Sequence, residues 1–233
     1  MDLKQMLSKN KTKKFFELAL AEITGYRIYL FRDACNRIMH GPDAPRFAER
    51  LWIDVGDCRK RMTRMGRKDE ISALVVSGRW PFENSMPVMD NGIIRNCVQH
   101  WVEGLPWNET DEADRISRAM EKYPGAYGCI KTEDIDDYLR KLDRMFGQIA
   151  EDGGFRTRKQ MEPRNFRERG GIVIHIGPDG ELFLGEDGNH RFAMAYSLDM
   201  LGKLERRSIP VEVGCVHQSA IGRLDSLRIP PRF

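Results

Sequence analysis

The sequence predicts an α+β protein because one long amphipathic helix is followed by three β-rich segments. Apolar residues from Ile135 to Ile149 recur along one helical stripe. Residues 172–176 and 181–184 are short apolar runs that flank a Gly-Pro-Asp-Gly turn, which predicts a β-hairpin. Residues 209–216 alternate in the manner of a half-buried strand, with Pro210 at its edge or beginning. Helices and strands therefore share the C-terminal part of the chain.

The N-terminal part has mostly helical spacing with short strands. Two helices are expected near its start, and the dipeptide Gly41-Pro42 ends that pattern. We expect a mostly helical N-terminal extension over residues 1–130 and a second domain over residues 131–233. The remaining N-terminal predictions are helical spacing over 13–39, strands at 51–55 and 71–76, and helices between 90 and 120.

Length and composition set the broad class. A chain of 233 residues with 41% hydrophobic content can bury a sizeable core. Its net charge of +3 gives no strong overall field for nucleic acid. The 5 cysteines form no C-x-x-C pair, so reduced thiols are the simplest interpretation. No apolar run reaches the roughly 18 residues that a membrane-spanning helix needs, and the chain does not open with a signal peptide, so we expect a cytoplasmic protein.

The turn over residues 185–191 carries the strongest functional signal. It links an apolar strand to a segment with helical apolar spacing, so it is expected to lie at a helix N-terminus, where unpaired N–H groups favour an anion. Arg191 adds a planar donor fork suited to phosphate, and His190 adds a group that exchanges protons near neutral pH. The first hypothesis is a phosphate-binding turn.

A purely structural interpretation of the same residues exists. Asp187 could cap the helix, Gly188 could supply a turn dihedral, and His190 with Arg191 could lie on a solvated first turn. Four special residues in succession between a strand and a helix favour the functional interpretation.

These residues resemble a known superfamily. The run Asp187-Gly188-Asn189-His190-Arg191, the apolar residues 192–195 and the later strand 209–213 are similar to the ParB/sulfiredoxin superfamily. Its members carry a D-G-x-H-R, G-E-R-R or G-C-H-R turn at this place. The resemblance covers residues 134–217 and implies a ParB/sulfiredoxin-like small mixed sheet with flanking helices.

The turn residues sort the branches of that superfamily. Sulfiredoxins use a cysteine where this chain has Asn189, which argues against a sulfinic-acid reductase. Partition proteins hold cytidine triphosphate with Glu-Arg-Arg, which is absent here. The D-G-x-H-R form resembles free-serine kinases and less characterised ParB-like proteins. The shared implication is a nucleoside di- or triphosphate, such as ATP, ADP or CTP, held at the turn.

The resemblance also implies roles for individual residues. Gly185, Glu186, Gly188 and Asn189 would form the nucleotide-binding turn. Two further arginines, Arg156 and Arg158, lie in the segment that approaches the nucleotide in the superfamily, although ordinary exposed arginines are an equal alternative.

The expected chemistry is phosphoryl transfer, as in a kinase, or nucleotide hydrolysis. Backbone groups of the turn would cradle phosphate while Arg191 neutralises developing charge, and His190 or Asp187 would position or deprotonate an acceptor. Whether the chain is an enzyme stays open, and a non-catalytic nucleotide-sensing module is one alternative.

A bound metal is a weaker expectation. Mg²⁺ would accompany a triphosphate, with Glu186, Asp187 and Glu212 as candidate carboxylates. Three histidines, at 175, 190 and 217, lie on separate elements, so no metal centre is assigned to them.

The other alternative is a DNA-binding ParB-like protein or nuclease. Five lysines lie between Lys4 and Lys14, and six cations lie between Arg59 and Lys68. Either stretch could contact a nucleic-acid backbone, which would make binding strongly dependent on salt. Solvated charged segments are the simpler interpretation of both.

Overall fold

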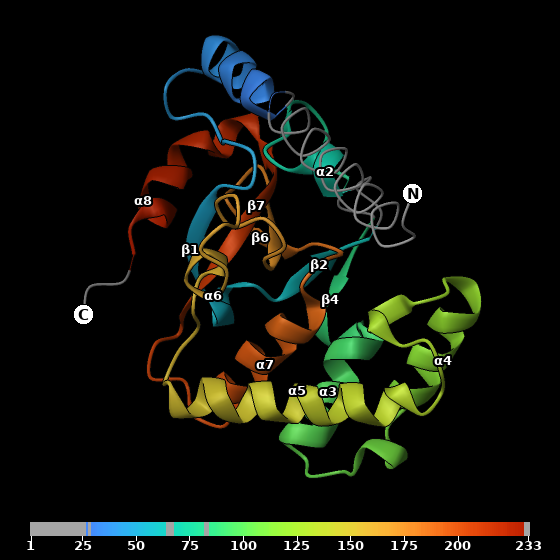
Figure 1. Cartoon of the computed structure of the whole chain (residues 1–233). Coiled ribbons are helices and arrows are strands. Elements are labelled where there is room, and N and C mark those ends of the chain that lie inside the picture. The colour runs from blue at the N-terminus through green and yellow to red at the C-terminus, as the bar shows by residue number, and fades with distance from the viewer. Residues whose placement is uncertain (1–26, 28, 64–67, 82–83, 231–233) are drawn as a thin grey trace, which may run out of the picture.

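The computed structural model describes residues 27, 29–63, 68–81 and 84–230, and its arrangement is that of an α+β protein (Figure 1). The strands are β1 (Arg50–Asp54), β2 (Lys60–Met62), β3 (Val75–Val76), β4 (Ser85–Pro87), β5 (Val173–Ile176), β6 (Leu182–Leu184) and β7 (Ser208–His217). The α-helices are α2 (Lys68–Ile71), α3 (Gly92–Trp101), α4 (Glu112–Lys122), α5 (Asp134–Glu151), α6 (Arg158–Met161), α7 (Asn189–Met200) and α8 (Leu224–Arg228), preceded by helical residues 29–40. The 3-10 helices are η1 (Val55–Asp57), η3 (Val88–Asp90), η4 (Trp107–Glu109), η5 (Ala126–Gly128) and η6 (Gln218–Arg223).

One mixed sheet organises the described residues. Its strand order is β1-β7-β5-β6-β2-β4, and β3 pairs with the far end of β7. The β5–β6 and β1–β7 pairs are antiparallel, whereas β5 and β2 run parallel to β7 and β6 respectively. Strands β1 to β4 precede residue 131, so the sheet spans the boundary that the sequence places after residue 130.

Helix α7 connects the sheet to the helical layer. Its Phe192, Ala195 and Leu198 belong to the main core with strands β1, β5, β6 and β7, whereas Met194 packs into a second cluster with α4 and α5. Figure 1 shows α7 between the sheet and the long α5, with α3 beside it. Because almost every side of α7 is covered, its N-terminus has a fixed place.

Most of the predicted elements are present. The long helix, the β5–β6 hairpin, the strand at β1 and the C-terminal strand β7 are confirmed. Pro210 lies near the start of β7, opposite Trp52, and the pairing with β5 begins only at Glu212. Pro210 therefore lies where β7 has a neighbouring strand on one side only, a position in which a proline without an N–H is tolerated.

The strand predicted over residues 71–76 is wrong in its first part. Helix α2 ends at Ile71, Ala73 has a positive φ of 59°, and only Val75 and Val76 form a strand. The hydroxyl of Ser72 donates to the Val213 carbonyl over 3.2 Å. This long-range contact fixes a turn that β-propensity alone does not reveal. The early part of the helical pattern predicted over 13–39 lies outside the described residues.

Candidate functional site

The turn between β6 and α7 packs tightly against β5. Gly188 has a φ of 79°, and a Cβ there would come within 2.6 Å of the Ile172 Cα. A Cβ on Gly185 would come within 2.9 Å of the His175 ring and of Val173. Only glycine combines this close approach with a left-handed backbone at position 188. The two glycines therefore set the direction in which α7 leaves the sheet.

Asn189, expected to bind nucleotide, fastens the turn. Its amide nitrogen donates to the Glu186 carbonyl over 2.5 Å, and its Oδ1 accepts from Asn91 over 3.0 Å. Asn91 in turn caps α3 by accepting from the Ile93 N–H. Asn189 thus ties the start of α7 to the start of α3.

His190 contacts the helices α4 and α5. Its Nε2 donates to Oε1 of Glu112 over 2.7 Å, and Nδ1 lies 3.3 Å from the Tyr138 hydroxyl. Because a carboxylate only accepts, Nε2 carries the proton, and Nδ1 of a neutral ring then accepts from the tyrosine. Both ring nitrogens are therefore used within the protein.

Glu112 is the centre of this arrangement and is fully buried. Arg115 binds both of its oxygens, at 2.8 and 2.5 Å, and Asn96 donates to Oε2 over 3.0 Å. Burial alone would raise the pKa of Glu112, but the hydrogen bonds from Arg115 and His190 outweigh it and lower the pKa to about 2. We call Asn96, Glu112, Arg115, Tyr138 and His190 the Glu112 network.

Arg191 has different neighbours from His190. Its Nη2 donates to the Arg156 carbonyl over 3.2 Å, and its guanidinium lies 6.0 Å from the centre of the Phe155 ring. Its Nη1 is buried and has no hydrogen-bond partner in the described part of the chain. Burial lowers the pKa of Arg191, and the nearby Glu168 partly offsets this.

Glu168 is the second buried acid beside α7. Its Oε1 accepts from the Arg158 N–H over 2.8 Å, but Oε2 is buried without a partner among the described residues, as is Nε of Arg158. Burial raises the pKa of Glu168, although the Arg158 N–H and the charges of Arg191, Arg50 and Arg158 oppose the increase. We call Arg158, Glu168 and Arg191 the Glu168 cluster.

A mostly apolar crevice adjoins Arg191. It has a volume of about 150 Å³ and lies between α5, the loop at 154–156, α6 and α7. Arg191 contributes to one wall, so a ligand in this space could combine apolar contacts with a cation. The residues that line this Arg191 crevice are Met145, Gln148, Ile149, Asp152, Gly154, Phe155, Arg156, Met161 and Arg191.

The other residues expected at the turn are more exposed. Glu186 is exposed, and the Asp187 carbonyl accepts from Val173 N–H over 3.3 Å. Arg156 is exposed and forms an ion pair of 2.8 Å with Asp152. The structure therefore brings Arg191 and Arg158 together, and it leaves Arg156 at the rim.

Several residues near the turn were not singled out by the sequence. Glu112 and Arg115 lie 78 and 76 residues before His190 and Arg191, and no local pattern connects them. Glu168 lacks a motif of its own. Arg61 is an exception, because the sequence places it in the basic stretch 59–68. On β2 it pairs with Leu184. Burial lowers the pKa of Arg61, and the charge of Glu186 opposes this decrease.

The candidate metal ligands do not converge. His175 is buried on β5 and its Nδ1 accepts from Cys215 N–H over 2.9 Å, whereas His217 contacts Ser219 and the Gly78 carbonyl. Glu212 accepts from Gly170 N–H over 3.0 Å, apart from the turn. Within the described ranges, no three His, Cys, Asp or Glu side chains are grouped as a metal site.

The two basic stretches have different outcomes. Lys4–Lys14 lies outside the described residues. In the second stretch Arg59 donates to the Gly56 carbonyl and Lys60 pairs with Glu181, while residues 64–67 are not described. Arg59 and Lys60 lie beside and on the short strand β2, and each contacts a different partner.

Among the helices that the structure describes, none is long and apolar enough to cross a bilayer. Comparisons with protein-family models, with curated proteins and with solved structures find no match to this chain.

Proposed function

We propose that this chain is a nucleotide-binding protein of the ParB-like type, which holds the phosphates of a nucleoside di- or triphosphate beside the turn at 185–191. The observation that carries the proposal is the buried Nη1 of Arg191, which has no partner among the described residues although a guanidinium is a strong donor. A phosphate oxygen would supply that partner.

Three neighbouring features support the same ligand. Helix α7 has 12 residues and begins at Asn189 after the N-cap Gly188, whose lack of a side chain leaves the first N–H groups of the helix to other acceptors. Arg158 adds a second cation, whose buried Nε has no hydrogen-bond partner among the described residues. The Arg191 crevice gives an apolar surface beside Phe155, on which a base could pack.

The chemistry that follows is phosphoryl transfer or nucleotide hydrolysis. In this proposal Arg191 and Arg158 stabilise negative charge on the transferred group, and Mg²⁺, if required, uses the carboxylates of the exposed Glu186 and the half-buried Asp187. His190 acts by holding the start of α7, since both of its nitrogens are occupied by Glu112 and Tyr138. In this proposal Asp187 keeps the role of orienting an acceptor that the sequence suggests for it.

Thermal unfolding with a panel of nucleotides tests binding. A ligand at 100 times its Kd stabilises the native state by about 2.7 kcal/mol, which raises the midpoint of a chain of this size by roughly 5–10 °C. We expect one nucleotide to give such a shift, with or without Mg²⁺, and Arg191→Gln to abolish it. The matched control is Arg118→Gln, an exposed arginine on α4. An unchanged shift in Arg191→Gln contradicts the proposal.

Turnover is measured second, with the nucleotide that binds. Release of phosphate or its transfer to a hydroxyl acceptor would assign an enzyme, whereas tight binding without turnover would assign a sensing module. Duplex DNA at two salt concentrations forms a separate arm, because a DNA-directed protein must show a steep loss of affinity with salt. The described residues give no specific support for that second function.

A further inference from the structure

A second cavity, distinct from the Arg191 crevice, is lined mainly by cations. It has a volume of about 400 Å³. It lies where residues 46–50 at the start of β1, helix α6, the loop that follows α6 and helix α8 meet. The lining residues are Arg46, Glu49, Arg50, Lys159, Arg167 and Arg228. Five of the six side chains are basic, and we call this the basic cavity.

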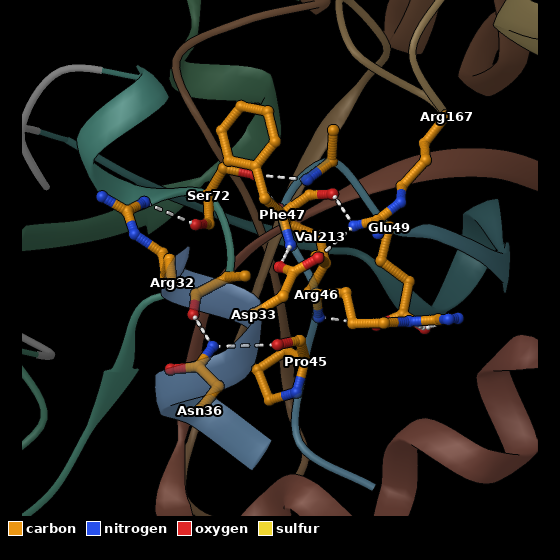
Figure 2. A network of polar contacts seen from close by, with 12 residues as sticks. Arg32, Asp33, Asn36, Pro45, Arg46, Phe47, Glu49, Ser72, Arg167 and Val213 are labelled. Atoms are coloured by element: carbon orange, nitrogen blue, oxygen red, sulfur yellow. Dashed lines mark hydrogen bonds and ion pairs between the residues drawn. The ribbon is translucent and has the colours of Figure 1, made fainter. Parts of the chain in front are cut away.

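Three of its arginines are held in place by acids, the buried Glu49 and the partly buried Asp33. Glu49 is 3% exposed and accepts from Arg46 and Arg228, each at 2.9 Å. Arg167 donates to Asp33 and to the Phe47 carbonyl, both at 2.7 Å, which joins the loop to helical residues 29–40 (Figure 2). These arginines are therefore oriented in advance, and their charges are largely matched.

The other two cations are not matched. Arg50 on β1 and Lys159 on α6 are exposed, and neither forms an ion pair with any described residue. Arg50 acts on the pKa of Glu168 only as a neighbouring charge. Two unmatched positive charges from separate elements thus face one hollow whose other walls are fixed.

A neighbouring cavity shows that this excess is local. That cavity has a volume of about 570 Å³ and shares Arg46 and Arg228 with the basic cavity. Its third arginine, Arg37, is accompanied by three aspartates, at 33, 43 and 225, so its charges balance. The excess of positive charge is therefore confined to the basic cavity, to which Arg50 and Lys159 contribute.

We propose that the basic cavity binds a phosphomonoester dianion. Its volume is within the usual range for small-molecule sites, and two unmatched cations suit a ligand with two negative charges on one group. Guanidinium groups bind phosphate oxygens through paired donors, which favours phosphate over a halide or a single carboxylate. The inference is independent of the proposed nucleotide site, because the two linings share no residue.

The test compares phenyl phosphate with phenyl sulfate, which has the same ring and one negative charge fewer at pH 8. Binding to the full chain is followed by titration calorimetry. The double variant Arg50→Gln/Lys159→Gln removes the unmatched charges and leaves Glu49 and its arginines intact. Its control is Lys141→Gln/Lys203→Gln, which removes two exposed lysines elsewhere.

We expect the wild type and the control to prefer phenyl phosphate, and the Arg50/Lys159 variant to lose about tenfold or more in affinity. Arg191→Gln should bind phenyl phosphate as the wild type does, which separates this site from the turn. Equal binding of the two probes, an unchanged affinity in the double variant, or a loss confined to Arg191→Gln would each overturn the proposal. The proposal would also be overturned if phenyl phosphate did not bind the wild type. If the wild type then bound duplex DNA in a salt-sensitive way, the cavity would be part of a nucleic-acid surface instead.

Discussion

Two buried glutamates beside α7, Glu112 and Glu168, each have an arginine nearby, but only Glu112 is fully paired. Both oxygens of Glu112 accept hydrogen bonds from Arg115, and His190 and Asn96 complete the set. Glu168 has one oxygen without a partner in the described part of the chain, and so does the neighbouring Arg191 with its Nη1. A satisfied network stabilises a fold, whereas unpaired buried groups cost stability and are typical of places where a ligand completes the set.

The pKa directions of the two acids repeat this difference. Hydrogen bonds outweigh burial at Glu112 and lower its pKa to about 2, while burial prevails at Glu168 and raises its pKa. Adjacent residues of one helix thus serve two purposes. His190 belongs to the satisfied network, and Arg191 belongs to the cluster with donors to spare.

Replacement of Glu112 should give the largest loss of stability. Glu112→Gln removes the buried carboxylate and leaves the partly buried Arg115 without its counter-charge, and breaking such a pair costs about 3–5 kcal/mol. Urea denaturation at pH 7 measures the free energy of unfolding. The matched variant Glu168→Gln should lose about 1 kcal/mol or less, because it removes an acid that is poorly satisfied already. Equal losses in the two variants would remove the distinction between the clusters.

The pH dependence of stability should have opposite signs for the two acids. The unfolded Glu112 titrates near 4.5 and the folded one near 2, so the unfolded state binds the proton in between and stability falls as the pH drops through this window. The full shift corresponds to about 3 kcal/mol. For Glu168 the folded pKa is the higher one, so its contribution to stability falls as the pH rises above 4.5.

Unfolding free energies between pH 2.5 and 7 check this contrast. The wild type minus Glu112→Gln difference should grow with pH up to about 5, whereas the wild type minus Glu168→Gln difference should shrink with pH. A flat difference for Glu112→Gln would mean that its hydrogen bonds do not favour the ionised form.

The sequence predicts much of the fold but little of this contrast. The 185–191 turn, the hairpin and the long helix follow from short-range patterns, in which glycines, apolar periodicity and turn residues act within a few positions. The pairing of His190 with Glu112 joins positions 78 residues apart, and no local sequence pattern connects them. Packing of distant segments decides whether the buried groups next to the turn have hydrogen-bond partners. The sequence alone therefore treats His190 and Arg191 as parts of one site.

Gly188 controls how the two clusters are separated, since it sets the exit of α7. Gly188→Ala should cost about 2–3 kcal/mol, because it combines a φ of 79° with a Cβ only 2.6 Å from the Ile172 Cα. Gly202→Ala is the control, with a φ of 64° and no atom within 4 Å of the added Cβ, and should cost about 1 kcal/mol. Urea denaturation of both variants isolates the steric part. Equal costs would show that the turn moves away from β5 freely.

The smallest change in stability is expected when both Glu168 and the neighbouring Arg191 are replaced. Glu168→Gln/Arg191→Met removes two buried charges together, which in proteins is often neutral or stabilising, so the free energy of unfolding should stay within about 1 kcal/mol of the wild type. The corresponding Glu112→Gln/Arg115→Met variant should still lose roughly 2–3 kcal/mol of unfolding free energy. The reason is that the donors of Asn96 and His190 lose the carboxylate that accepts their hydrogen bonds. Urea denaturation of the two double variants, side by side, measures the difference. A loss of several kcal/mol in the Glu168/Arg191 variant would show that its charges hold the fold as those of Glu112 do, and the case for a ligand at Arg191 would then rest on nucleotide binding alone.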